Sequence, residues 1–143
     1  MIIGLGTDLV GIARIAGVYA RHGGHFLART YSDAECAYCL AARDPAERLA
    51  ARWAAKEACM KALGTGWAKG VTFTDISLLA DSAGVPRLTL AGGALLVAQR
   101  LGAARWHCSV SHSDGFAIAV VVLEDAPAPG LGSTADARSM GGP

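Results

Sequence analysis

At 143 residues, the chain is long enough for one domain with a substantial hydrophobic core. Hydrophobic residues make up 52% of the sequence, a share that favours a packed globule over a disordered chain. The formal net charge is +1, so overall charge excludes a strongly basic nucleic-acid or membrane-surface binder. Any electrostatic recognition therefore has to be local.

The first segment, residues 1–10, is rich in Ile, Leu and Val and predicts a β-strand. It carries Gly4-x-Gly6, but Leu9 stands where a dinucleotide-binding fingerprint needs its third glycine, so we reject that motif. Asp8 is then a carboxylate among apolar residues near a strand end, although aspartate is a poor strand former. Two interpretations are open: Asp8 serves a ligand, or it caps the following helix.

Residues 12 to about 29 predict a helix with two consecutive glycines as an interruption. The segment contains no acidic residue, and Arg14 and Arg21, seven positions apart, share one face of it. This basic face is either an ordinary solvated surface or a docking surface for an acidic partner, whose association it would accelerate by complementary charge.

Two further helices follow. The pattern Ser32-x-x-Glu35 is a capping box that opens a short helix. Asp44-Pro45 opens a longer, alanine-rich helix, because an acidic cap followed by proline is a typical helix start, and Gly64 is placed to end it.

The longer helix carries charges beside its apolar face. At about 100° per residue, Lys56 projects into that face, Glu57 and Lys61 line one edge, and Arg52 lines the other. Buried charges need partners, and a bound anion together with a cation would supply them. The alternative is an ordinary surface ion pair between Glu57 and Lys61, with Lys56 and Arg52 reaching water.

The second half of the chain predicts two hairpins and a helix. The strands are expected at 71–80, 87–90, 106–112 and 116–124, and the helix at 91–101. The whole order predicts an α+β domain at residues 1–125, with a mainly antiparallel sheet and a long central helix. Residues 126–143 are rich in Pro, Gly, Ala and Ser, and we expect them to be disordered.

Other features limit the environment of the protein. The four cysteines (Cys36, Cys39, Cys59 and Cys108) lack a zinc or disulfide spacing and are expected to be reduced thiols. No signal peptide and no apolar run of about 18 residues is visible, so we expect a cytoplasmic protein that does not span a membrane.

At the end of one expected strand, Ser111 and His112 either contact a phosphate or simply face water.

Three motifs occur in a recognisable order. They are Gly6-Thr7-Asp8, Trp53-Ala54-Ala55-Lys56-Glu57-Ala58-x-x-Lys61-Ala62 and Ser109-x-Ser111-His112. With these motifs, residues 1–124 resemble the holo-[acyl-carrier-protein] synthases, the small class of 4′-phosphopantetheinyl transferases. The resemblance implies that fold, and an enzyme that moves the phosphopantetheine arm of coenzyme A onto a serine of an apo acyl carrier protein, releasing adenosine 3′,5′-bisphosphate.

The resemblance also implies residue roles. Asp8 and Glu57 are expected to hold Mg²⁺ and, with Lys61, to form the catalytic set. The residues expected to bind coenzyme A are Arg52, Lys56, Lys61, Gly64, Thr65, Gly66, Ser111 and His112. The general base is either Glu57 or a metal-bound water, and both alternatives stay open. Arg14 and Arg21 are expected to dock the carrier protein.

Family members of this length are typically homotrimers with sites between subunits, so His112 is expected to serve the neighbouring subunit's site. The chain also departs from the family pattern. Many relatives have a glutamate in place of Gly11, and larger transferases have a third acid in place of Val10. Two carboxylates and more water are therefore implied at the metal. Thr7 replaces the usual aliphatic residue.

Two rival functions stay open. One is a carrier-protein-binding module that has the fold without the chemistry, and the other is a metal-dependent phosphoryl transferase acting on a different nucleotide. The presence of Asp8, Glu57 and Lys61 together favours the transferase over the binding module, because docking would need only the basic helix.

Overall fold

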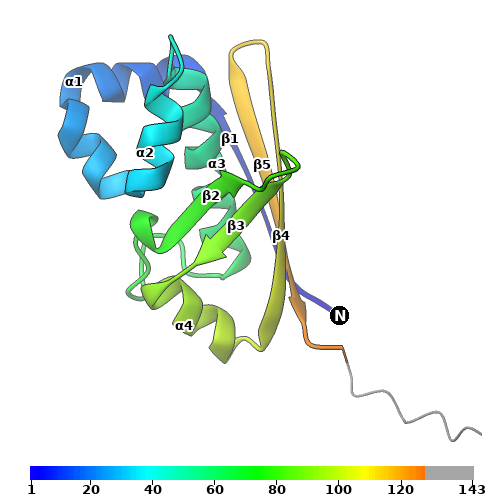
Figure 1. Cartoon of the computed structure of the whole chain (residues 1–143). Coiled ribbons are helices and arrows are strands. Elements are labelled where there is room, and N and C mark those ends of the chain that lie inside the picture. The colour runs from blue at the N-terminus through cyan, green and yellow to red at the C-terminus, as the bar shows by residue number, and fades with distance from the viewer. Residues whose placement is uncertain (128–143) are drawn as a thin grey trace, which may run out of the picture.

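The structure, a computed structural model, describes residues 1–127. Its elements are β1 (Ile2–Gly11), α1 (Ile12–Thr30), α2 (Asp33–Leu40), α3 (Ala46–Ala62), the 3₁₀ helix η1 (Phe73–Asp75), β2 (Ile76–Ala80), β3 (Pro86–Leu90), α4 (Gly92–Arg100), β4 (Ala103–Ser113) and β5 (Phe116–Asp125). Figure 1 shows α1 and α2 at one end of the molecule and α4 at the other. The disorder expected at 126–143 mainly concerns residues 128–143, which lie outside the described residues.

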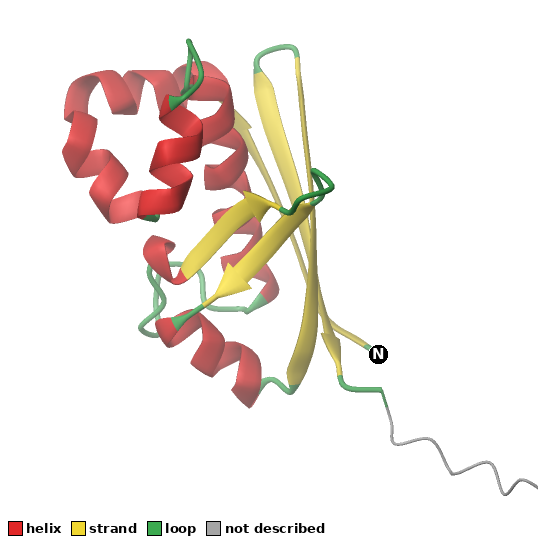
Figure 2. Ribbon diagram, in the orientation of Figure 1, coloured by secondary structure: helices red, strands yellow, loops and turns green. Residues whose placement is uncertain are grey.

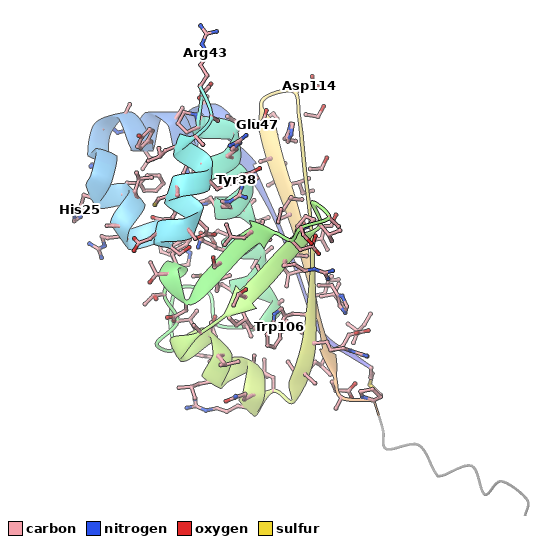
Figure 3. The ribbon with its side chains drawn as sticks, viewed as in Figure 1. His25, Tyr38, Arg43, Glu47, Trp106 and Asp114 are labelled. Atoms are coloured by element: carbon pink, nitrogen blue, oxygen red, sulfur yellow. The ribbon has the colours of Figure 1, made fainter. Side chains whose placement is uncertain are left out.

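The strands form two antiparallel sheets, one in the order β1-β5-β4 and one of β2 and β3, as Figure 2 shows. In the larger sheet Asp8 pairs with Ala119, which also pairs with Val110. The predicted α+β class with antiparallel strands is confirmed. Trp106 links the two sheets, because its indole N–H donates to the Leu88 carbonyl oxygen at 2.8 Å (Figure 3).

One predicted strand is wrong in its first half. Residues 71–75 do not extend β2, because Thr72 and Asp75 form a capping box that winds η1 instead. The Asp75 carboxylate accepts the Thr72 backbone N–H at 3.0 Å. The interruption expected in α1 is present, since Gly23 adopts a non-helical conformation with φ at 48°.

Helix α3 lies so close to β1 that two strand positions have no room for a side chain. A Cβ on Gly6 would lie 1.9 Å from the Ala58 carbonyl oxygen, and one on Gly4 would lie 2.5 Å from that of Ala62. The spacing Gly4-x-Gly6 is therefore explained by helix-on-strand packing. The alanines of α3 supply the other half of this close fit.

Replacing Gly6 with Ala should lower the free energy of unfolding by about 2 kcal/mol, because the added methyl has to push two backbones apart. Urea unfolding measures this loss. Gly11→Ala is the matched control, since a Cβ at that β1 position meets nothing within 4 Å. Equal effects of the two substitutions would contradict the packing explanation.

The single apolar face predicted for α3 is too limited, because the helix is buried around most of its circumference. It contacts β1 and β5 of the larger sheet, and also α1, α2 and β2. Arg52 and Lys56 are buried. The alternative in which their charged ends reach water is therefore wrong. Charges in the centre of the molecule therefore need partners inside it.

All four cysteines are free, and burial raises the pKa of the Cys59 thiol to about 12. Within residues 1–127, no helix combines the length and the apolar character needed to cross a bilayer.

Candidate active site

Asp8 and Lys61 meet where β1 runs beneath the last turns of α3. The alternation of β1 turns Asp8 to the same side as Gly6, which faces the helix. Lys61 Nζ donates to Asp8 Oδ1 at 3.0 Å and to the Thr7 carbonyl oxygen at 2.8 Å. Asp8 does not cap α1, because the N-cap residue is Gly11 and no side chain bonds to that helix start. The ligand interpretation of Asp8 is therefore the one that this geometry favours.

Glu57 lies one helical turn before Lys61, the residue that forms the ion pair with Asp8. Burial is the main cause that raises the Glu57 pKa, and the negative charge of Asp8 raises it further. A hydrogen bond from Trp67 and the charges of Lys61 and Arg14 act in the opposite direction. The negative charge of Asp8 thus disfavours the ionised form of Glu57, and a bound cation would relieve that repulsion.

The acidic pair fits a hard divalent cation that takes the rest of its ligands from water and phosphate. Glu57 Oε1 accepts the Trp67 indole N–H at 2.9 Å, and Asp8 Oδ1 accepts Lys61. No hydrogen bond reaches the other oxygen of either carboxylate from residues 1–127. No group of three or more His, Cys, Asp or Glu side chains with metal-site geometry occurs in the same range. Magnesium commonly binds one or two carboxylates plus waters and substrate phosphates.

The turn after α3 is built by two glycines in left-handed conformations. Gly64 has φ at 69° and Gly66 has φ at 53°. The amides of Gly64 and Thr65 donate to the carbonyl oxygens of Lys61 and Met60, so they close the helix and are not available to a nucleotide. Of these three amides, only that of Gly66 has no acceptor within the described residues.

The expected contact between Lys56 and coenzyme A is wrong. The Lys56 ammonium is fully buried and donates to Glu35 Oε2 at 2.8 Å, to the Phe73 carbonyl oxygen at 3.0 Å and to the Ile76 carbonyl oxygen. Burial is the main cause that lowers the pKa of Lys56, and the Glu35 carboxylate opposes it. With all three N–H groups used, Lys56 is a structural residue.

Arg52 and His112 line a cavity of about 400 Å³ at the start of α3, which we call the basic cavity. The Arg52 guanidinium lies over the Tyr38 ring at 4.3 Å, and its buried Nε has no hydrogen-bond partner within the described residues. His112 Nε2 lies 3.2 Å from Glu47 Oε1. Figure 3 shows Glu47 at the end of α3 nearest the β4–β5 hairpin. Arg48, whose guanidinium covers the same Tyr38 ring, adds a further positive charge.

Within one chain, this basic cavity lies apart from the acidic pair of Asp8 and Glu57. Glu47 and Glu57 are ten residues apart on one helix, which separates them by roughly 15 Å along its axis. Ser111, being next to His112 on β4, projects from the opposite side of the sheet. One chain thus contains two half-sites, an acidic one and a basic one.

The predicted docking arginines are exposed on α1. The Arg14 guanidinium lies 6.0 Å from the centre of the Trp53 ring, and its charge acts on Glu57. The basic face of α1 therefore borders the acidic half-site.

Sequence reasoning missed an aromatic cavity beside this half-site. Its volume is about 700 Å³, and its wall includes Trp53, Trp67 and Phe73. The rings of Trp53 and Phe73 are stacked with their centres 4.7 Å apart. Helical spacing does not connect these three rings, because Trp53 lies on α3, Trp67 lies in the turn that follows it and Phe73 lies in η1.

The chain belongs to the 4′-phosphopantetheinyl transferase superfamily, whose sequence model matches residues 4–121. It is 52% identical to the holo-[acyl-carrier-protein] synthase of Solidesulfovibrio magneticus over 124 residues, which cover 87% of this chain and 99% of the relative. The synthase of Koribacter versatilis is 48% identical over 125 residues, covering 87% of this chain and 100% of the relative.

Solved structures agree with the fold. The holo-[acyl-carrier-protein] synthase of Neisseria meningitidis superposes with a TM-score of 0.80 at 34% identity, covering 87% of this chain and 100% of the other. The Helicobacter pylori synthase, solved in complex with coenzyme A, gives a TM-score of 0.74 at 36% identity, covering 84% and 99%. The predicted family and fold are thereby confirmed.

Proposed function

We infer that the chain transfers the 4′-phosphopantetheine group of coenzyme A to a serine of an apo acyl carrier protein, giving the holo carrier and adenosine 3′,5′-bisphosphate. The observation that carries this function is the Asp8–Lys61 ion pair, with Glu57 one helical turn from Lys61 and within the electrostatic influence of both, in a member of this transferase superfamily. Relatives named for the same activity match the chain over nearly their full lengths.

In this reaction the serine hydroxyl of the carrier loses its proton to Glu57 or to a water molecule, and its oxygen forms a bond to the phosphorus that carries the pantetheine arm. The bond from that phosphorus to the bridging oxygen breaks, and adenosine 3′,5′-bisphosphate leaves. Asp8 and Glu57 are the residues that would hold Mg²⁺, which acts as a Lewis acid on phosphate oxygens when bound. Lys61 spends two N–H groups on Asp8 and Thr7, so its third can point to a phosphate as charge develops.

The same proposal places coenzyme A between two copies of the chain. The acidic half-site of one copy would hold the diphosphate, while Arg52 and His112 of the next copy would hold a further phosphate. The aromatic cavity beside Glu57 has room for the less polar arm. Two half-sites that are roughly 15 Å apart along one helix support this sharing.

We propose a homotrimer, and the outer face of the larger sheet supports an oligomer. Apolar side chains project from it into solvent, with Leu5 66% and Leu9 62% exposed. Phe116, Ile118 and Val120 continue the surface on β5. A contiguous exposed apolar face of this kind is typical of an oligomer interface.

A charged residue at this face should dissociate the oligomer. Leu9→Glu is expected to shift the molar mass, measured by light scattering, from three chains to one, and to abolish transfer because each site would lose its second half. Leu101→Glu is the matched control, since Leu101 is an exposed leucine at the end of α4. A fully active monomer would overturn the shared site.

Incubation with coenzyme A, Mg²⁺ and an apo acyl carrier protein tests the proposed activity. The intact mass of the carrier should rise by one phosphopantetheine group. Carrier binding without a mass gain would favour the non-catalytic binding module. No gain and no binding would favour a phosphoryl transferase that uses another nucleotide.

Arg14→Glu should raise the KM for the carrier roughly tenfold and leave coenzyme A binding nearly unchanged, because charge reversal opposes an acidic partner. Steady-state kinetics with each substrate varied in turn separates the two effects. Arg100→Glu, on α4 at the other end of the molecule in Figure 1, is the control. Equal loss of carrier and coenzyme binding would show that Arg14 belongs to the coenzyme site.

We also propose a cytoplasmic location, which the four free thiols support because disulfide-free chains suit a reducing compartment.

A further inference from the structure

Trp67 is an exposed aromatic residue whose orientation is nevertheless fixed. It follows Gly66, and 68% of its surface is open to solvent. Its ring meets Trp53 and Phe73 edge to face, with ring centres 6.5 and 5.6 Å apart. These contacts hold the indole against the rim of the aromatic cavity, so its N–H has a defined direction.

That direction is toward Glu57. The indole N–H donates to Glu57 Oε1 at 2.9 Å, and indole has no other polar atom. Asp8 has a corresponding arrangement, because Lys61 donates to its Oδ1 at 3.0 Å. Each carboxylate of the pair therefore has one oxygen held by a protein donor and one without a hydrogen bond from residues 1–127.

We propose that Trp67 is a positioning residue for Glu57: its indole N–H holds one carboxylate oxygen so that the other is presented to the cation shared with Asp8. The inference rests on the proposed function, which supplies the cation. A glutamate side chain has several rotamers, and ordering it before the cation arrives removes an entropic penalty from binding. Hydrogen bonds to a metal-binding carboxylate from such partners typically change metal affinity by 10–100-fold.

The probe is Mn²⁺, titrated into the protein with coenzyme A present and counted by the electron paramagnetic resonance signal of the free ion. A titration of coenzyme A alone gives the background. Trp67→Phe keeps an aromatic ring against Trp53 and Phe73 but removes the N–H. It should raise the Kd for Mn²⁺ roughly tenfold. At saturating Mn²⁺ most of the turnover should return, because Glu57 itself is intact.

Trp106→Phe is the matched control. This substitution also removes an indole hydrogen bond, the one to the Leu88 carbonyl oxygen, but at the junction of β3 and β4. It should leave the Kd for Mn²⁺ within about twofold of the unchanged protein, since it does not touch either carboxylate. Thermal unfolding of both variants verifies that they are folded.

Glu57→Gln separates the two levels of the proposal. Weak Mn²⁺ binding in both Glu57→Gln and Trp67→Phe, with Trp106→Phe unaffected, supports the role of Trp67. Weak binding in Glu57→Gln alone would overturn the role of Trp67 and leave the metal site standing. Unchanged binding in Glu57→Gln would overturn the metal site and, with it, the role of Trp67.

Discussion

Replacing Glu57 with Gln should slow carrier modification by at least roughly 100-fold, although the side chain keeps its shape. The substitution removes one of the two negative charges that would attract the cation, while the amide oxygen can still accept the Trp67 N–H. The loss therefore tests the charge of Glu57 apart from its packing. The measurement is the initial rate of mass gain of the carrier.

Asp33→Asn is the control for this experiment. Asp33 lies in the first turn of α2 and is exposed, so its change from carboxylate to amide has the same chemistry outside the site. It should leave the rate within about twofold. Mass gain at the original rate in Glu57→Gln would remove Glu57 from the catalytic set.

Replacing Glu35 with Ala should lower the free energy of unfolding by about 3–5 kcal/mol, because it leaves a buried ammonium without its counter-charge. Glu35 and Lys56 are both fully buried. Glu35 Oε2 accepts Lys56 Nζ at 2.8 Å, and Oε1 accepts the Leu78 backbone N–H at 2.8 Å. This one carboxylate thus joins α2, α3 and β2. Urea unfolding measures the loss.

The double variant Glu35→Leu with Lys56→Met distinguishes a structural pair from a substrate site. Replacing both charges by apolar groups should recover much of the stability lost in Glu35→Ala, because no unpaired charge remains. The KM for coenzyme A should stay within about twofold, since the Lys56 ammonium has no N–H left for a phosphate. A large rise in that KM, in a folded variant, would return Lys56 to the binding site.

The Glu35–Lys56 pair illustrates what local sequence patterns predict. Ser32-x-x-Glu35 predicts the start of α2, and the structure contains that capping box. The pattern already accounts for Glu35, so nothing in the sequence calls for a second partner 21 positions away. Lys56 consequently resembled an unpaired charge that needed a ligand. A contact between distant segments depends on the packed fold, and periodicity within one helix does not report it.

The acidic half-site shows the opposite case. Asp8 and Glu57 were predicted as partners from motif order and resemblance, because each motif alone has an ordinary structural explanation. Trp67 had no comparable signal, since it lies in a glycine-rich turn without periodicity. The capping box of Thr72 and Asp75 was likewise not predicted, because the alternation of residues 71–80 favoured a strand.

A crystal structure with coenzyme A and Mn²⁺ tests the central claim most directly, because Mn²⁺ can be located by its anomalous scattering. We expect one Mn²⁺ within coordination distance of both the Asp8 and the Glu57 carboxylates, next to the diphosphate of coenzyme A. An ion bound elsewhere, or the two carboxylates turned away from each other with the coenzyme in place, would contradict it.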